Sequence, residues 1–89
     1  MSQVIVDPSE LRRFSAFLGE LIVDLRTAEQ SCSRKFSELK TVWRDDKLKE
    51  FEPKYERTVS ELDRFSRACE RYAAYLDSKA SRVEKYLQG

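Results

Sequence analysis

Residues 42–48 read Val-Trp-Arg-Asp-Asp-Lys-Leu and contain Trp43, the single tryptophan of the chain. On both sides of this stretch, apolar residues recur at alternating spacings of three and four, which is typical of amphipathic helices. The regular pattern pauses only between Val42 and Leu48. The sequence therefore predicts two helices joined by a very short connection at this point.

The N-terminal apolar series predicts a helix over about residues 8–43. Asp7 is a suitable N-cap, Pro8 suits the first helical position, and Glu10 can complete a capping box. Only Lys35 interrupts the series. Its apolar members are Leu11, Phe14, Leu18, Leu21, Leu25, Ala28, Cys32, Leu39 and Val42.

The C-terminal series predicts a second helix over about residues 46–87. Pro53 removes one backbone hydrogen bond, but the apolar pattern continues through it, so we expect a kink rather than a break. The members of the series are Leu48, Phe51, Tyr55, Thr58, Leu62, Phe65, Cys69, Tyr72, Leu76, Lys79, Val83 and Tyr86. A connection as short as Arg44 and Asp45 requires the helices to lie antiparallel. The predicted fold is all-α, a single helical hairpin over residues 1–89.

Each series follows two lines of a heptad pattern, a and d, which we expect to pack inside the hairpin. A third line, e, is also largely apolar or small: Ser15, Ile22, Glu29, Phe36 and Trp43, then Val59, Ser66, Ala73, Ala80 and Leu87. Phe17 and Tyr75 widen the face on the other flank. A face this wide is typical of a four-helix bundle. We therefore expect an interface with a second hairpin formed by Phe17, Ile22, Phe36, Trp43, Val59, Ala73, Tyr75, Ala80 and Leu87.

The two cysteines, Cys32 and Cys69, both fall on the apolar series and are interpreted as small core residues. The hairpin places Cys32 opposite the region of Arg57 or Thr58, and Cys69 opposite the region of Leu21. The thiols are then separated by about twelve residues, or roughly 18 Å, along the axis. A disulfide needs α carbons closer than about 7 Å, so the hairpin excludes one within a chain.

The charge pattern argues against nucleic-acid binding. Charged residues make up 37% of the chain, yet the net charge is only +1. Regular alternation of charge in the second helix indicates a solvated outer face. The acids recur every seven residues, at Glu56, Asp63, Glu70, Asp77 and Glu84, and four of them are followed by Arg57, Arg64, Arg71 and Lys85. A basic strip is formed by Arg64, Arg67 and Arg71, but acids are interleaved with it.

Residues that carry chemistry are scarce. The chain has no histidine, no metal-ligand spacing and no glycine-rich phosphate loop. We predict no catalytic, cofactor-binding or metal site. The sequence shows neither a signal peptide nor an apolar run that could span a bilayer. We expect a cytoplasmic protein without membrane insertion, and export without a cleaved signal stays open.

A hairpin of two long helices with a tryptophan at the turn resembles the WXG family, the small early-secreted-antigen-like substrates of bacterial type VII secretion. The family motif Trp-X-Gly corresponds to Trp43, Arg44 and Asp45. Aspartate tolerates left-handed backbone and can cap a helix, so the turn can accept it in place of glycine. The resemblance implies a homodimer or a heterodimer with a sister protein, and an association with secretion machinery.

The chain departs from that family at its C-terminal end. The family's export signal, Tyr-X-X-X-Asp/Glu, has no counterpart, because Leu76 follows Tyr72 and Lys79 follows Tyr75 at the fourth position. The alternative is a cytoplasmic helical adaptor or structural subunit unrelated to secretion.

Overall fold

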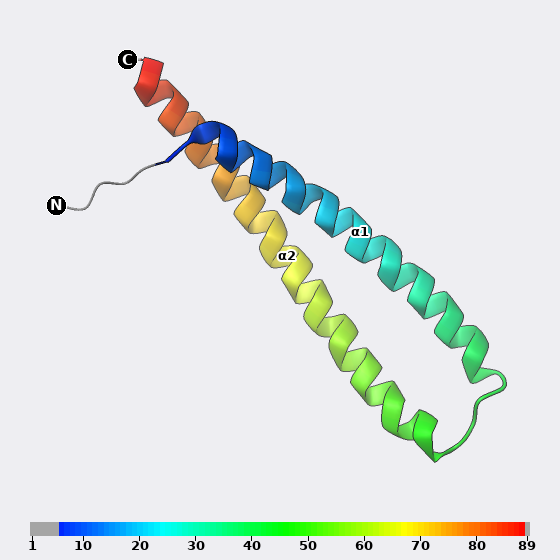
Figure 1. The fold of residues 1–89 in the computed structure, drawn as a ribbon. Helices are drawn as coiled ribbons and strands as arrows, with labels where there is room; N and C mark the ends of the chain where they lie inside the picture. Colours follow the sequence, from blue (N-terminus) through cyan, green and yellow to red (C-terminus); the bar gives the residue numbers. More distant parts are fainter. Residues whose placement is uncertain (1–5, 89) are drawn as a thin grey trace.

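A computed structural model describes residues 6–88 of the chain, which form two long antiparallel helices (Figure 1). Helix α1 spans Pro8–Lys40 and helix α2 spans Asp46–Gln88. The Cα atoms extend over 66 × 26 × 13 Å, so the hairpin is a flat plate with two broad faces. The prediction of an all-α antiparallel hairpin is confirmed.

The start of α1 follows the predicted cap. Asp7 Oδ1 accepts hydrogen bonds from the Ser9 backbone N–H at 2.9 Å and from the Ser9 hydroxyl at 2.7 Å. These bonds hold the pKa of the Asp7 carboxyl below its ordinary value. The carboxylate of Glu10 forms a salt bridge with Arg13 at 2.7 Å.

Helix α1 ends at Lys40, earlier than the predicted residue 43. The backbone N–H groups of Thr41 and Val42 donate to the carbonyls of Glu38 and Leu39, which tightens the last turn from α to 3₁₀ geometry. The Thr41 hydroxyl also donates to the Glu38 carbonyl at 2.7 Å. The chain leaves the helix here because it must turn back toward α2. Helix α2 is continuous through Pro53.

The packing of the helices is described with three lines of residues that repeat every seven positions. Line a is Leu11, Leu18, Leu25, Cys32 and Leu39 in α1, and Leu48, Tyr55, Leu62, Cys69, Leu76 and Val83 in α2. Line d is Phe14, Leu21, Ala28 and Lys35 in α1 and Val42 just after it, then Phe51, Thr58, Phe65, Tyr72, Lys79 and Tyr86 in α2. Line e is Ser15, Ile22, Glu29 and Phe36 in α1 and Trp43 in the turn, then Val59, Ser66, Ala73, Ala80 and Leu87 in α2.

Lines a and e, and not a and d, pack inside the hairpin. The buried residues are Ser15, Leu18, Ile22, Phe36, Ser66, Cys69 and Ala80, all from lines a and e. Line d leaves Phe14, Phe65 and Tyr72 exposed. The prediction that line d is internal was therefore wrong. Small side chains on line e let the helices approach closely, whereas the aromatic rings of line d are too large for that space.

The close approach also satisfies a buried polar group. The Ser15 hydroxyl donates to the Ala73 carbonyl of the facing helix at 3.1 Å. A buried hydroxyl without such a partner would destabilise the fold. Line e therefore provides both the space and a hydrogen bond across the helix pair.

Both cysteines are free, and their positions along the hairpin follow the prediction. Cys69 is buried in a core cluster with Leu18 and Ile22, against which Leu21 packs. Cys32 lines a hollow together with Thr58. Cys32 is exposed, however, so its interpretation as a core residue was wrong.

The two d lines lie on the same broad face of the hairpin. In each helix, line d lies on one side of line a and line e on the other. Because the helices are antiparallel, this arrangement brings both d lines to one face. Ala28 and Thr58, one from each d line, accordingly line the same hollow between the helices. We call this side the aromatic face.

Because Ile22 is buried and its neighbour Val23 is exposed, alanine substitutions at these two positions should change the free energy of unfolding by different amounts. Replacement of Ile22, which is 7% exposed, by alanine should lower the free energy of unfolding by about 2–4 kcal/mol, because it leaves a cavity. Val23→Ala is the matched control, since Val23 is 61% exposed and should change it by less than about 0.5 kcal/mol. Urea titration followed by helical circular dichroism measures both. Equal effects would contradict the assignment.

Candidate functional site: the aromatic face and the turn

Four exposed aromatic side chains lie within two residues of Ser15 or Ala73, which are joined by a hydrogen bond between the helices. They are Phe14, Phe17, Tyr72 and Tyr75, which we call the aromatic patch. Phe14 and Phe17 stack with their ring centroids 5.8 Å apart, yet Phe17 remains 51% exposed and Tyr72 64% exposed. Soluble monomers rarely expose a large contiguous apolar surface, and such a surface marks a site of interaction.

The opposite face is crossed by ion pairs. Arg12 contacts Glu84 at 2.6 Å, and Arg26 contacts Glu70. Each of these residues follows a line a residue by one position, and so lies on the side away from line d. Glu70 is exposed and Glu84 is partly exposed, as predicted for an outer face, and both also pair with arginines of α1. We call this side the salt-bridge face.

The salt bridges between helices also fix the register. They occur at three levels of the hairpin, because Lys40 contacts Glu52 at 3.0 Å near the turn. Each pair is partly exposed and stabilises the fold only weakly. The two broad faces thus differ in kind: one is joined by ion pairs within the chain, and the other presents aromatic rings to solvent.

The turn is organised by Asp45. Its Oδ1 accepts hydrogen bonds from the Trp43 indole N–H at 2.8 Å, and from the backbone N–H groups of Lys47 at 2.9 Å and Leu48 at 3.2 Å. The last two bonds make Asp45 the N-cap of α2, as predicted. One carboxylate oxygen therefore holds both the helix start and the tryptophan ring.

Trp43 is half-buried and closes the turn end of the core. Its ring centroid lies 6.1 Å from that of Phe51. Phe36 lies 5.5 Å from Phe51 and 4.6 Å from Tyr55, so a continuous aromatic cluster fills this end of the hairpin. Arg44, between the two anchored residues, is exposed.

The residues predicted to form the interface fall into three groups. Ile22, Phe36 and Ala80 are buried within the hairpin. Trp43, Val59 and Ala73 are half-buried between its helices. Phe17, Tyr75 and Leu87 are exposed, and the first two belong to the aromatic patch.

Sequence reasoning missed Phe14, Phe65 and Tyr72 as exposed aromatic residues. The available signal was side-chain size. Line d is rich in Phe and Tyr, whereas line e carries Ser and Ala, which suit close helix packing.

Comparison with known proteins identifies no relative: no family model matches the chain, and no curated protein matches it. Within residues 6–88, no three or more Cys, Asp or Glu side chains are grouped so that they could hold a metal ion. Over the same residues, neither helix combines the length and apolar character needed to cross a bilayer.

The role of Asp45 can be tested at the turn. Asp45→Ala should lower the free energy of unfolding by about 1–2 kcal/mol through loss of the N-cap. It should also shift the Trp43 emission to longer wavelength, because the indole loses its anchor. Asp46→Ala, one residue later, is the control. It should change the free energy of unfolding and the Trp43 emission much less than Asp45→Ala does. Fluorescence and urea titration give both readouts; an unchanged emission maximum would argue against the anchor.

The ion pairs predict a dependence of stability on pH. The hydrogen bond from Arg12 lowers the pKa of Glu84 below its ordinary value of 4.5, so the folded chain binds this proton more weakly than the unfolded chain. The contribution is therefore present above pH 4.5 and is lost as the pH falls through the lowered pKa. We expect the urea midpoint of Glu84→Gln to fall less than that of the wild type between neutral pH and pH 3. Parallel curves would show that the pair contributes nothing.

Proposed function

We propose that the chain is a non-catalytic protein–protein interaction module that docks a second helical hairpin on its aromatic face to form a four-helix bundle. The observation that carries the proposal is the exposed aromatic patch. Its four rings lie on the face that the chain's own ion pairs leave open. Covering them would remove apolar surface from water, which is the main driving force for protein association.

A helical partner fits the shape of this face. The d lines of α1 and α2 run side by side along the hairpin, and each presents side chains at helical spacing. A partner helix can place its own side chains between these rows, as in bundles and coiled coils. Aromatic residues are also enriched among the side chains that contribute most to binding at interfaces.

A WXG-type role is the more specific form of the proposal. The long hairpin and the tryptophan anchored in its turn support it, and Asp45 supplies a physical reason why the turn does not need glycine. The partner is then a second copy or a sister hairpin, and secretion machinery is a further partner. The alternative, a cytoplasmic adaptor or structural subunit unrelated to secretion, would use the same face.

Site-specific photo-crosslinking tests the docking face for either partner. A benzophenone amino acid in place of Tyr72 should give a crosslinked product of defined mass in cells that naturally produce the protein, because this position lies within the proposed interface. The same substitution at Asp63 is the control, since Asp63 is exposed and lies on the side away from line d. Mass spectrometry then identifies the partner. Equal crosslinking at both positions, or none at position 72, would overturn the proposal.

A further inference from the structure

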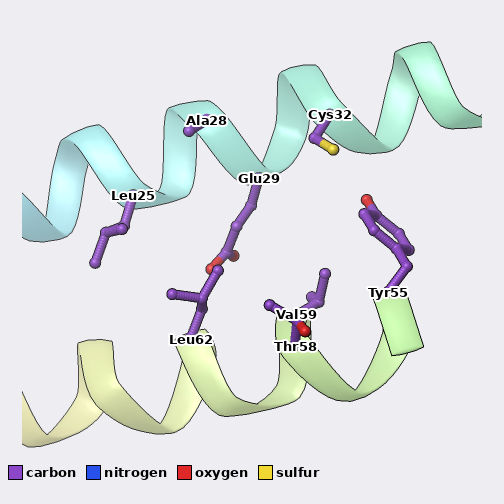
Figure 2. Close-up of a pocket in the computed structure, with 8 residues that line it drawn as sticks. All are labelled: Leu25, Ala28, Glu29, Cys32, Tyr55, Thr58, Val59 and Leu62. Atoms are coloured by element: carbon purple, nitrogen blue, oxygen red, sulfur yellow. The ribbon is translucent and has the colours of Figure 1, made fainter. Parts of the chain in front are cut away.

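A hollow opens between the helices near the middle of the hairpin (Figure 2). Its volume is about 260 Å³. Line a contributes four of its lining residues and lines d and e contribute two each, so the hollow lies between the helices and is bordered on the aromatic face by Ala28 and Thr58. The lining residues are Leu25, Ala28, Glu29, Cys32, Tyr55, Thr58, Val59 and Leu62.

Glu29 is the one acidic residue in this otherwise largely apolar lining. Its side chain extends from α1 across the gap toward Val59 and Leu62 of α2 (Figure 2). Within the described part of the chain, the buried Oε1 atom has no hydrogen-bond partner. Arg26, one turn away on α1, is already engaged by Glu70.

The pKa of Tyr55, which lines the same hollow, is shifted by its surroundings. Burial raises the pKa of its hydroxyl, the neighbouring Cys32 thiol adds to the rise, and the charge of Glu29 contributes in the same direction. Glu29 and Tyr55 therefore lie close to each other in the lining of the same hollow.

Docking on the aromatic face would make this carboxylate harder to accommodate. A partner that covers the face expels water from the hollow, and an unpaired carboxylate in an apolar environment is strongly unfavourable. A purely apolar partner would leave that penalty in place. A partner that brings a cation would remove it, because a paired and hydrogen-bonded charge is tolerated in such a site.

The size of the hollow limits what the cation can be. Small-molecule sites usually enclose about 300–1,000 Å³, and this hollow is smaller. A single long side chain fits better, with its methylene groups against Leu25, Leu62 and Val59 and its charged end at Glu29. Lysine and arginine have that form, an apolar stem with a cationic head.

We propose that the hollow receives a lysine or arginine side chain from an otherwise apolar stripe of a partner helix, with Glu29 as its counter-ion. The inference rests on the proposed docking function and adds the chemistry of the partner. Glu29 then selects among helical partners, because a helix without a suitably placed cation would bury the carboxylate unpaired.

The line d lysines of a second copy do not reach this site in a symmetric dimer. The lysines on line d are Lys35 and Lys79, and Lys35 lies roughly 9 Å along α1 from Glu29. A two-fold axis along the hairpin would place the neighbourhood of Thr58 opposite Glu29. A two-fold axis across its middle would place the neighbourhood of Leu21 there. Neither arrangement with fully overlapping faces brings a line d lysine to the carboxylate.

The experiment uses n-hexylammonium as a mimic of the side chain, with hexanol and hexanoate as comparators, and backbone amide NMR of the full chain as the readout. Hexylammonium should shift the amide signals around the hollow, those of Cys32, Val59 and Leu62, at lower concentration than either comparator. Glu29→Gln should weaken its binding about tenfold, through loss of a charge-assisted hydrogen bond. Glu20→Gln, at an exposed position of α1, should leave the binding unchanged.

A second variant guards against indirect effects of the first. Ala28→Leu keeps Glu29 but fills the hollow, and should abolish the same shifts while leaving the helical circular dichroism intact. Equal binding of hexanol, shifts centred elsewhere, or unaltered binding to Glu29→Gln would overturn the proposal. The titration needs no partner, so a failed crosslink at position 72 with intact hexylammonium binding would refute the docking function and not the cation site.

Discussion

The close approach of the two helices along line e is the constraint on which the rest of the structure depends. Small side chains, including Ser15, Ser66 and Ala80, lie where the helices face each other, and all three are buried. Where these small residues face each other there is little space between the helices, so the rings of Phe14, Phe65 and Tyr72 on line d lie outside. Toward the turn the helices leave room for an aromatic ring, and Phe36 of line e is buried there. The exposed aromatic patch is therefore a geometric consequence of how the hairpin packs, and its availability for a partner follows from the same residues.

The salt-bridge face complements this arrangement. A hairpin held only by apolar contacts along a narrow seam can slip by a turn, since neighbouring turns of a helix look alike to an apolar partner. A slip by one turn would separate Arg12 and Arg26 from the acids they meet, because these acids recur only every seven residues along α2. The ion pairs therefore favour the observed register of the two helices, although each pair alone stabilises the fold only weakly.

Apart from the end of α1, the sequence was sufficient for the features that depend on short-range spacing. Helical periodicity predicted both helices, the cap at Asp7 and the turn at Asp45 could be inferred from their chemistry, and the short connection required the antiparallel pairing. It was not sufficient to decide which two of three adjacent apolar lines face inward, because periodicity treats Ser66 and Phe65 as near neighbours. Their volumes decide it, and only through packing against the other helix.

The candidate site was less predictable for the same reason. Phe17 and Tyr75 were identified, but the surface that unites them with Phe14 exists only once the two d lines meet on one face. The hollow at Glu29 depends on the exact separation of the helices at that level, so no spacing rule could have shown it. The ion pairs could have been predicted from the sequence, because Arg12, Arg26 and Lys40 recur at intervals of two heptads along α1.

The three salt bridges between helices also imply an order in which the hairpin closes. The Lys40–Glu52 pair joins residues 12 positions apart, the Arg26–Glu70 pair residues 44 apart, and the Arg12–Glu84 pair residues 72 apart. Chain entropy opposes each closure more as the loop grows, so pairing is least opposed beside the aromatic cluster at the turn. Once it begins there, each further turn closes only a short additional segment. The molecule should therefore zip from Trp43 toward its termini, and open in the reverse direction.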